Sequence, residues 1–344
     1  MKNSFELNDE RPLVTFALFA YNQEQYIREA IEGAFSQTYE PLEIILSDDK
    51  SSDRTFEIMQ EMVAAYKGKH KITVRQSRSN LALIDHVYEV GQICKGEIIV
   101  FAAGDDISSP DRVHELMMVW ETDSSAAYSG YNLIDASGTI LSHDVKPISD
   151  IAKRFPWLVG TSDQFVYGAS SAYRIDVVKL LKKANKKIFS EDTPLNAIIQ
   201  LDNRKVSYCS KSLVNYRVHD ATLSNSRVLS SNIEDILVAE KKHRISCSRN
   251  LDILVYIEHH IIPIFKNSET LVDRNILNKL ILELETKIRW DTLGLSKRLY
   301  LLFHSDWALK RWVMLRILGD KFYSLIKSIQ IKLKFEDDDI KWKK

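Results

Sequence analysis

The sequence predicts an α/β fold: a mostly parallel sheet flanked by helices, with a helical extension at the C-terminus. Two observations support this prediction. Short apolar strand candidates alternate with amphipathic helix candidates over residues 13–106, which is typical of β-α-β units with right-handed crossovers. After about residue 226 the strand signals end and helical patterns follow. The 344 residues therefore divide into an α/β domain, residues 1–226, and a helical region, residues 227–344.

Four strands and three helices are expected in the first part of the chain. The strands are continuous apolar or β-branched runs, and the helices carry apolar side chains along one face. The strands are expected over Leu13–Ala20, Leu42–Leu46, Ile72–Arg75 and Ile98–Phe101, and the helices over Glu24–Gln37, Thr55–Tyr66 and Asn80–Lys95. Pro110 opens a further helix, and a later apolar helix spans Leu195–Leu201.

The composition fits a globular protein and argues against a general nucleic-acid binder. Apolar residues make up 45%, enough for a sizeable core, and Lys+Arg and Asp+Glu are equal at 47 each. The three widely spaced cysteines, with a polar N-terminus that lacks the apolar segment of a signal peptide, indicate the reducing cytoplasm. No apolar run approaches the length of a membrane-spanning helix.

Polar side chains follow the predicted strands at the edge where open α/β sheets bind ligands. They are Tyr21-Asn22, Asp48-Asp49 and Asp105-Asp106. Adjacent carboxylates beside a dry core are costly unless a cation or a hydroxyl-rich ligand offsets their charge. Oxygen ligands suit Mg²⁺ or Mn²⁺, especially when a diphosphate supplies further oxygens. The alternative for Asp105 and Asp106 is an ordinary acidic turn before a helix.

Two common nucleotide-binding motifs are absent from the sequence. No Gly-x-Gly-x-x-Gly follows the first strand and no Gly-x-x-x-x-Gly-Lys-[Ser/Thr] occurs, so neither NAD nor ATP in a P-loop is expected. Carboxylates at strand ends can instead accept hydrogen bonds from a base imide and from ribose hydroxyls.

Two segments in the middle of the chain leave alternatives open. The small-residue segment Gly168–Arg174 either lines an acceptor cleft or packs as a tight strand. Glu191 and Asp192 precede the helix with Pro194, and capping of that helix is the simpler interpretation from the residues alone. A single histidine such as His219 is by itself weak evidence for a ligand site.

Taken together, these segments resemble the family 2 glycosyltransferases, inverting enzymes with the GT-A fold. The resemblance covers residues 11–226. It rests on Ala20-Tyr21-Asn22, Gln37-Thr38-Tyr39, Asp48-Asp49-Lys50-Ser51-Ser52-Asp53, Asn80, Gly96-Glu97, Gly104-Asp105-Asp106, Pro110-Asp111-Arg112, Glu191-Asp192 and Tyr216-Arg217-Val218-His219. Three departures stand out: Lys50 and Ala82 occupy positions where Gly is usual, and Gly104 replaces a frequent third Asp.

The resemblance implies a role for each matching residue. Asp192 is implied as the general base with Glu191 as its neighbour, and Asp106 as the ligand of Mn²⁺ or Mg²⁺ with His219 as a metal or diphosphate contact. Asp49 is implied to contact the nucleotide base and Asp105 the ribose. The implied nucleotide-sugar site comprises Ala20, Tyr21, Asn22, Asp49, Asn80 and Asp105.

The implied activity is metal-dependent sugar transfer from a UDP-, dTDP- or GDP-linked donor to a glycan or lipid-linked glycan, in cell-surface polysaccharide synthesis. One alternative is a non-catalytic sugar-nucleotide or glycan-binding subunit of a biosynthetic complex, although every carboxylate that the chemistry needs is present. A nucleotidyltransferase is a weaker alternative, because the Gly- and Lys/Arg-rich loop expected after Leu18 is absent.

In the C-terminal region the sequence predicts helices over Ile233–Cys247, Ile253–Phe265 and Arg274–Leu293. Its last part, Trp307–Leu318, is aromatic, apolar and basic. Such a stretch either lies on an anionic membrane at the cytoplasmic face or belongs to a helical subdomain that packs on the catalytic core or makes an oligomer contact. Both interpretations stay open at this stage.

Overall fold

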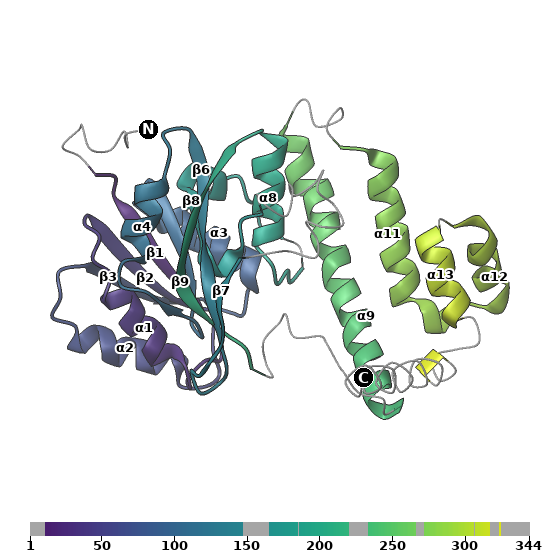
Figure 1. The fold of residues 1–344 in the computed structure, drawn as a ribbon, viewed down its shortest axis with the longest axis horizontal. Coiled ribbons are helices and arrows are strands. Elements are labelled where there is room, and N and C mark those ends of the chain that lie inside the picture. Colours follow the sequence, from purple (N-terminus) through teal and green to yellow (C-terminus); the bar gives the residue numbers. More distant parts are fainter. Residues whose placement is uncertain are drawn as a thin grey trace, which may run out of the picture. The chain divides into compact units, whose positions relative to one another are not determined.

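The computed structural model describes residues 11–146, 165–184, 186–219, 233–265, 272–305, 307–316 and 323–324. A nine-stranded sheet with helices around it occupies the N-terminal part, and the C-terminal part is helical (Figure 1). The chain divides into two compact units, one of Met1–Thr222 with Val255–Val272 and one of Leu223–Leu254 with Asp273–Lys344.

The predicted alternation of strands and helices is confirmed over the first hundred or so residues. The elements are β1 (Val14–Ala20), α1 (Ile27–Phe35), β2 (Leu42–Asp48), α2 (Thr55–Ala65), β3 (Lys71–Gln76), α3 (Leu83–Ile93) and β4 (Ile98–Ala103). The four strands pair in parallel in the order β3-β2-β1-β4. The helix α3 begins three residues after the predicted Asn80, because Ala82 at its N-terminus has a non-helical backbone with φ of 60°.

Beyond β4 the sheet becomes mixed, which the sequence did not predict. The elements are β5 (Ile107–Ser108), α4 (Arg112–Val119), β6 (Ser124–Ile134), β7 (Ile140–Val145), η2 (Gly168–Ser170), β8 (Ser171–Arg174), α7 (Ile175–Val178), α8 (Asp192–Leu201) and β9 (Lys205–Arg217). β8 is antiparallel to both β4 and β6, whereas β9 runs parallel to β6 and antiparallel to β5. This second half brings β9 beside the segment that follows β4.

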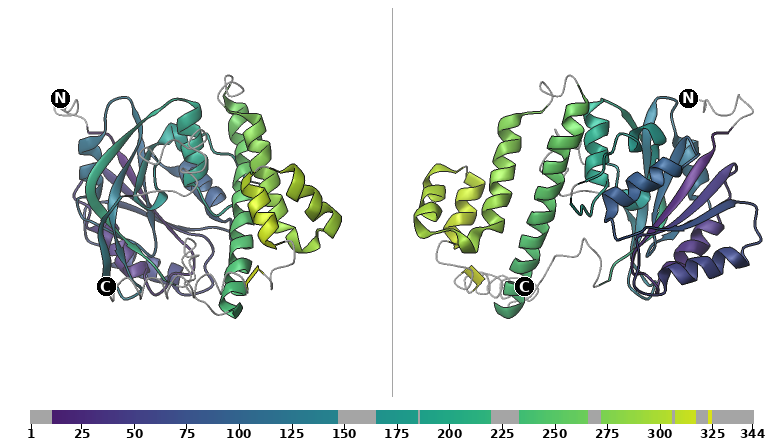
Figure 2. Two further views of the ribbon diagram at one scale, coloured as in Figure 1. Left: turned by 45° about the vertical axis from the view of Figure 1, so that its right-hand side comes forward. Right: turned by 180° about the vertical axis from the view of Figure 1, so that it is seen from behind.

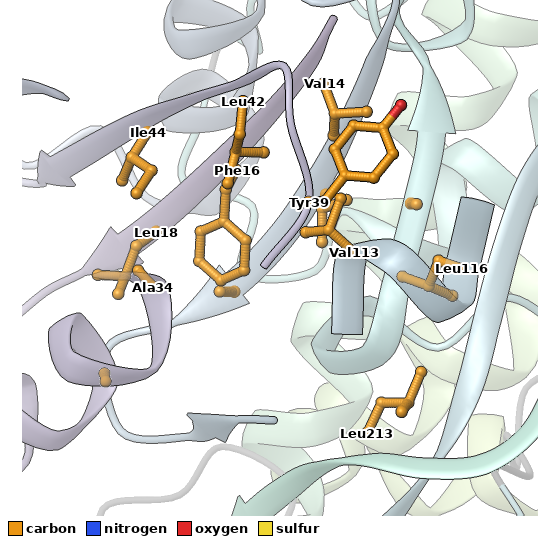
Figure 3. Close-up of a cluster of buried hydrophobic side chains, with 14 of the residues drawn as sticks. Val14, Phe16, Leu18, Ala34, Tyr39, Leu42, Ile44, Val113, Leu116 and Leu213 are labelled. Carbon is orange, nitrogen blue, oxygen red and sulfur yellow. The ribbon is translucent and has the colours of Figure 1, made fainter. Parts of the chain in front are cut away.

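Alternate side chains of the central strands divide between the two faces of the sheet, as their period of two requires. Phe16 and Leu18 of β1, with Ile44 of β2, face one way and contribute to a buried cluster with Ala34 and Val113 (Figure 3). Helices α1, α2 and α4 therefore cover this face, and Figures 1 and 2 show α1 and α2 side by side below the strands. The packing holds the carboxyl ends of β1, β2 and β4 in fixed register.

The C-terminal helices differ from prediction in one respect. Residues expected to form two helices between Ile233 and Phe265 instead form one continuous helix, α9 (Ile233–Tyr256). It is followed directly by a π-helical turn, η3 (Ile257–Ile261), and a 3₁₀ turn, η4 (Ile262–Ile264). The remaining elements are α11 (Arg274–Ile288), η5 (Trp290–Thr292), α12 (Leu295–His304) and α13 (Trp307–Arg316). Among the described residues, none of the helices combines the length and apolar character needed to cross a membrane.

Part of the aromatic, basic stretch at the C-terminus packs inside its own unit. Trp290 is fully buried, and Leu309 and Val313 of α13 pack in the same cluster. The ring of Trp312 meets that of Trp290 edge-on, with 5.0 Å between centroids. This face of α13 therefore packs within the helical unit, and most of residues 317–344 lie outside the described residues.

Candidate active site

The ends of β1, β2 and β4 bring the predicted polar residues to one edge of the sheet. Ala20 lies beside Asp48 in the register of β1 and β2, and the N–H of Asp49 donates to the Ala20 carbonyl at 2.9 Å. The N–H of Gly104 donates to the Phe19 carbonyl at 2.9 Å. A Cβ at Gly104 would lie 2.7 Å from the Ala20 Cβ, so glycine is required here for close approach of the two strand ends.

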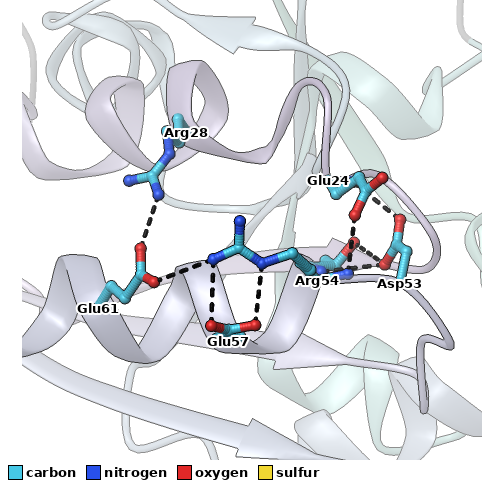
Figure 4. Close-up of polar contacts among 7 residues, drawn as sticks. Glu24, Arg28, Asp53, Arg54, Glu57 and Glu61 are labelled. Carbon is cyan, nitrogen blue, oxygen red and sulfur yellow. Dashed lines mark hydrogen bonds and ion pairs between the residues drawn. The ribbon is translucent and has the colours of Figure 1, made fainter.

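Hydrogen bonds tie the loop after β2 to the segment that precedes α1. The main-chain N–H of Glu24 donates to Asp53 at 3.0 Å, and the N–H of Arg54 donates back to the Glu24 carboxylate at 3.0 Å (Figure 4). Arg54 also pairs with Glu57 at 3.0 Å. These charges are exposed, so each ion pair adds little stability. The two main-chain hydrogen bonds are what fix the loop.

The same loop holds the predicted nucleotide residues Tyr21 and Asn22. Asn22 has a φ of 52°, and its side-chain oxygen accepts from the Ser52 N–H at 2.8 Å. Its own N–H donates to Ser51 Oγ at 2.8 Å. Tyr21 is 47% exposed and presents its ring to solvent at the end of β1. Both residues are exposed, but the Asn22 side-chain oxygen is engaged by Ser52, whereas the Tyr21 ring faces solvent.

Asp49 uses both carboxylate oxygens within the protein. Oδ1 accepts from the N–H of Leu81 at 2.8 Å and Oδ2 from the N–H of Ala82 at 2.9 Å. Burial raises the pKa of Asp49 to about 6, although these two N–H groups oppose the shift. Asn80 adds a long contact, 3.5 Å, from its side-chain amide to the Asp49 carbonyl. Asp49 thus fixes the loop before α3.

Two departures from the family pattern fall at left-handed backbone positions. Lys50 has a φ of 63° and Ala82 a φ of 60°, a region that glycine adopts freely and residues with a Cβ resist. Ala82 combines this φ with a ψ of 174°, a combination found almost only at glycine. Glycine would adopt both conformations without this strain.

Asp105 and Asp106, adjacent in sequence, lie in different environments. Asp105 Oδ2 lies 3.1 Å from His219 Nε2, with 17% of the Asp105 side chain and 12% of the His219 side chain exposed. Asp106 is buried, and its Oδ1 accepts from the Arg217 main-chain N–H at 2.8 Å. Its Oδ2 is buried without a hydrogen-bond partner among the described residues. Burial, and then the charge of Asp105, raise the pKa of Asp106 well above its ordinary range.

Arg217 organises this end of the site, a role that sequence reasoning missed. Its guanidinium is 1% exposed and donates to the carbonyl of Asp105 at 2.9 Å and of Ala136 at 3.0 Å, and it pairs with Glu29 of α1. It also lies 4.8 Å from the centroid of the Tyr26 ring. The Tyr-Arg-x-His sequence was the available signal, but only its histidine was given a role.

The residues present fit a divalent cation that is shared with a diphosphate. Asp105 and His219 offer an oxygen and a nitrogen donor, a set that Mn²⁺ accepts. Within the described ranges, no group of three His, Cys, Asp or Glu side chains is placed to hold a metal ion. A cation bound here would therefore need further ligands, such as diphosphate oxygens or water.

Glu191 and Asp192 differ in the same way at the start of α8. Glu191 stands at the N-cap position, but its side chain makes no capping hydrogen bond. Burial, and then the charge of Asp192, raise the pKa of Glu191 to about 8. Asp192 is half-buried, and its Oδ1 accepts from Ser190 Oγ at 2.5 Å and from the Thr193 N–H at 2.7 Å. Burial also raises the pKa of Asp192, but these hydrogen bonds oppose the shift.

Gly168 lies against both members of this second carboxylate pair. A Cβ at residue 168 would lie 2.1 Å from Glu191 Oε1 and 3.6 Å from the Asp192 Cβ, so only glycine allows the segment to pass this close. Of the two alternatives for Gly168–Arg174, the tight strand is seen in β8, whose first three residues are buried, while the acceptor cleft stays a prediction. A hydrogen bond from Gly168 stabilises the charged form of Asp192.

Comparison with known proteins identifies the family. Residues 15–181 match the family model for glycosyl transferase family 2. These residues belong to glycosyl transferase family 2. This family 2 segment contains β1 to β4 with Asp49, Asp105 and Asp106, whereas Asp192 and His219 follow it along the chain.

The family 2 segment also resembles named proteins. An uncharacterized glycosyltransferase of Rickettsia felis is 30% identical over 151 residues, 43% of this chain and 24% of that protein. A chondroitin synthase of Escherichia coli is 32% identical over 138 residues, 38% of this chain and 19% of that protein. The chain thus spans about a quarter or less of the length of these two relatives.

A solved structure shares the fold at low sequence identity. It is the mannosyltransferase PcManGT from Pyrobaculum calidifontis, solved in complex with GDP-Man and Mn²⁺. The TM-score is 0.51 at 12% identity, covering 93% of this chain and 88% of that chain. The α/β architecture with a helical C-terminal region is therefore that of GT-A glycosyltransferases.

Proposed function

We propose that this protein transfers a sugar, with inversion, from a nucleotide-sugar donor to a hydroxyl of a glycan or lipid-linked glycan. The observation that carries the proposal is the pair at the start of α8. Glu191 is buried and has a pKa raised to about 8, so it is protonated at neutral pH, whereas Asp192 is half-buried and hydrogen-bonded. One accessible carboxylate beside a neutral acid is the environment expected of a single general base.

In the proposed reaction Asp192 takes the proton of the acceptor hydroxyl. The hydroxyl oxygen then forms a bond to the anomeric carbon from the face opposite the nucleotide. The bond from that carbon to the diphosphate oxygen breaks, and the nucleoside diphosphate leaves with the electron pair. This single displacement forms no covalent intermediate on the protein. It therefore requires no nucleophilic Ser or Cys.

Asp105 and His219 are the residues proposed to hold Mn²⁺ or Mg²⁺. The sequence assigned the cation to Asp106 with His219, but Asp106 is buried and accepts from Arg217, while Asp105 faces His219 at 3.1 Å. When bound, the cation supplies Lewis-acid stabilisation of the leaving diphosphate. In this proposal Asp106 positions Asp105 by accepting a hydrogen bond from the Arg217 N–H of β9.

The donor is proposed to bind along the ends of β1, β2 and β4. Tyr21 is exposed there, while Asn22 and Asn80 border the loops that Asp49 and Ser52 hold in place. Ala20 lies at the end of β1, against Gly104 of the neighbouring strand end. A UDP-, dTDP- or GDP-linked sugar fits this proposal, and the GDP-Man and Mn²⁺ in the mannosyltransferase structure support including both in a first test.

We place the reaction in cell-surface polysaccharide synthesis at the cytoplasmic face of the membrane. The similarity to a chondroitin synthase supports a polysaccharide product. Exposed apolar side chains on α12, namely Leu295, Leu299, Tyr300 and Phe303, support a peripheral membrane contact. Flotation of the full chain with anionic vesicles tests the contact, and failure to float contradicts it.

The experiment that tests the function is a nucleotide-sugar panel with and without Mn²⁺. We expect one donor to raise the melting temperature and to be hydrolysed slowly in the absence of acceptor, with both effects lost in the presence of chelator. A protein that binds a donor but neither hydrolyses nor transfers it would be the non-catalytic subunit instead. Absence of binding to every donor would contradict the proposal.

A further inference from the structure

Three tyrosine rings, here called the tyrosine trio, pack together in the N-terminal unit. Tyr131 comes from β6, Tyr167 directly precedes η2, and Tyr216 lies near the end of β9. The centroids of Tyr131 and Tyr167 are 5.5 Å apart with the rings nearly parallel. Tyr216 lies 5.4 Å from Tyr131 and 5.7 Å from Tyr167. Segments far apart in the sequence thus meet in one aromatic cluster.

Hydrogen bonds fasten the trio to the proposed base. The side chain of Asn196, fully buried in α8, both donates to the Val166 carbonyl and accepts from the Val166 N–H at 2.9 Å. The same amide donates to the Asp192 carbonyl at 2.8 Å. Tyr167 follows Val166 directly, and the next residue, Gly168, passes close to Glu191 and makes a main-chain hydrogen bond to the Asp192 carboxylate. Tyr167 therefore follows a residue that is hydrogen-bonded to the same Asn196 side chain as the Asp192 main chain.

A second set of contacts fastens the trio to the proposed cation site. Asn132 beside Tyr131 donates to the Asn215 side chain beside Tyr216 at 3.0 Å, which locks β6 to β9. Arg217, the next residue of β9, donates its main-chain N–H to Asp106. The trio therefore joins the segment that carries the base to the segment that carries Asp105 and His219.

Exposure distinguishes the trio from tyrosines that only fill the core. Tyr173 and Tyr128 are buried, with 0% and 1% of their surface exposed, whereas all three members of the trio are only half-buried. A tyrosine presents an apolar ring with a polar hydroxyl at one end. Pyranose rings match this surface, since one face carries C–H groups while hydroxyls project from the edge towards polar partners.

We propose that the tyrosine trio is the acceptor platform, on which a pyranose ring of a glycan stacks beside Asp192. This inference rests on the proposed function and deepens it, because it specifies that the group at the acceptor site is a sugar. A pyranose stacked on the trio would bring a hydroxyl of the glycan to Asp192, the proposed base. The platform also accounts for three tyrosines from separate segments, which the transfer chemistry does not itself require.

The test uses the full-length protein on an array of defined oligosaccharides, in the presence of Mn²⁺ and either UDP or GDP. Retained oligosaccharides are then titrated against Tyr131→Ala, Tyr216→Ala, and the matching Phe variants. Tyr208→Ala is the matched control, because Tyr208 also lies on β9, is 37% exposed and packs against the Tyr128 ring outside the trio. Nucleoside diphosphate binding is measured on every variant to verify the fold and the donor half.

We expect each Ala variant of the trio to bind the oligosaccharide about tenfold more weakly, the scale of one lost aromatic contact. The Phe variants should stay within about threefold, because they lose only a hydroxyl hydrogen bond. Saturation-transfer NMR should place the sugar C–H face on the rings of the parent protein. The proposal is overturned if no oligosaccharide is retained, or if the Ala variants bind as tightly as the parent and Tyr208→Ala. Failure of the proposed function gives a different result, loss of nucleotide binding in the parent itself.

Discussion

The two carboxylate pairs of the site, Asp105-Asp106 and Glu191-Asp192, are alike in sequence but each is divided by the fold. Asp106 and Glu191 are buried and have raised pKa values. Asp105 and Asp192 keep exposed surface and contact polar partners, His219 and Thr193. In each pair, then, the more exposed acid is the one that we propose for the chemistry. Burial disfavours the charged form of an acid, and the charge of its neighbour adds to that effect in Asp106 and in Glu191.

The largest effect is expected at the base. Asp192→Asn should lower turnover by about 10²–10⁴-fold with donor affinity retained, because the amide cannot take the acceptor proton. Steady-state kinetics measures the turnover, and calorimetry measures the donor affinity. Glu191→Gln is the matched control and should keep most of its turnover, because Glu191 is already protonated at neutral pH. If Glu191→Gln is instead the inactive variant, the division within this pair is reversed.

At the other pair the comparison predicts that Asp105, not Asp106, binds the cation. Asp105→Asn should weaken Mn²⁺ binding by at least about 100-fold, more than loss of an outer-shell partner usually does. Asp106→Asn should weaken it less, since the amide keeps an oxygen that can accept from the Arg217 N–H. Mn²⁺ affinity is measured by calorimetry with nucleoside diphosphate present. The opposite ranking would restore the assignment drawn from the sequence.

A smaller effect should appear in the pH dependence of stability. Folding raises the pKa of Glu191 from its ordinary 4.5 to about 8, so the folded protein binds this proton more tightly than the unfolded chain. Its contribution to the free energy of unfolding is fully present below about pH 4.5 and is lost as the pH rises towards 8. Urea titrations of the parent between pH 5 and pH 8 should show this decline.

Glu191→Gln again serves as the control for that slope. The variant cannot titrate at residue 191, so its decline between these pH values should be shallower than that of the parent. Equal slopes in the two proteins would show that Glu191 is not a buried neutral acid.

The smallest effect concerns Asp49, a third buried acid, and the loop that it holds. Ala82→Gly should stabilise the protein by about 1 kcal/mol, because glycine relieves the left-handed backbone at φ of 60° and ψ of 174°. The N–H that donates to Asp49 is kept in this variant. The urea midpoint measures the change, with Ala65→Gly at the end of α2 as a control that should be destabilised by helix propensity. A destabilised Ala82→Gly would contradict the strain argument.

The sequence alone was sufficient for the first half of the fold. Continuous apolar runs and one-sided helices are local patterns, and they gave β1 to β4 with the helices between them to within a few residues. The convergence of Asn22, Asp49 and Asp105 at one edge also followed, because parallel strands align their carboxyl ends. The mixed second half did not, since the pairing of β8 and β9 joins segments distant along the chain.

Only the tertiary structure decided the chemistry of each acid. The two members of a pair such as Asp105-Asp106 have the same side chain and nearly the same position in the sequence, so nothing local separates them. Their difference comes from β9, which places the Arg217 N–H against Asp106 and His219 against Asp105. The tyrosine trio has the same origin, because its rings arrive from three segments that only the folded sheet brings together. Burial and partners are properties of packing between distant segments, and these set the pKa values.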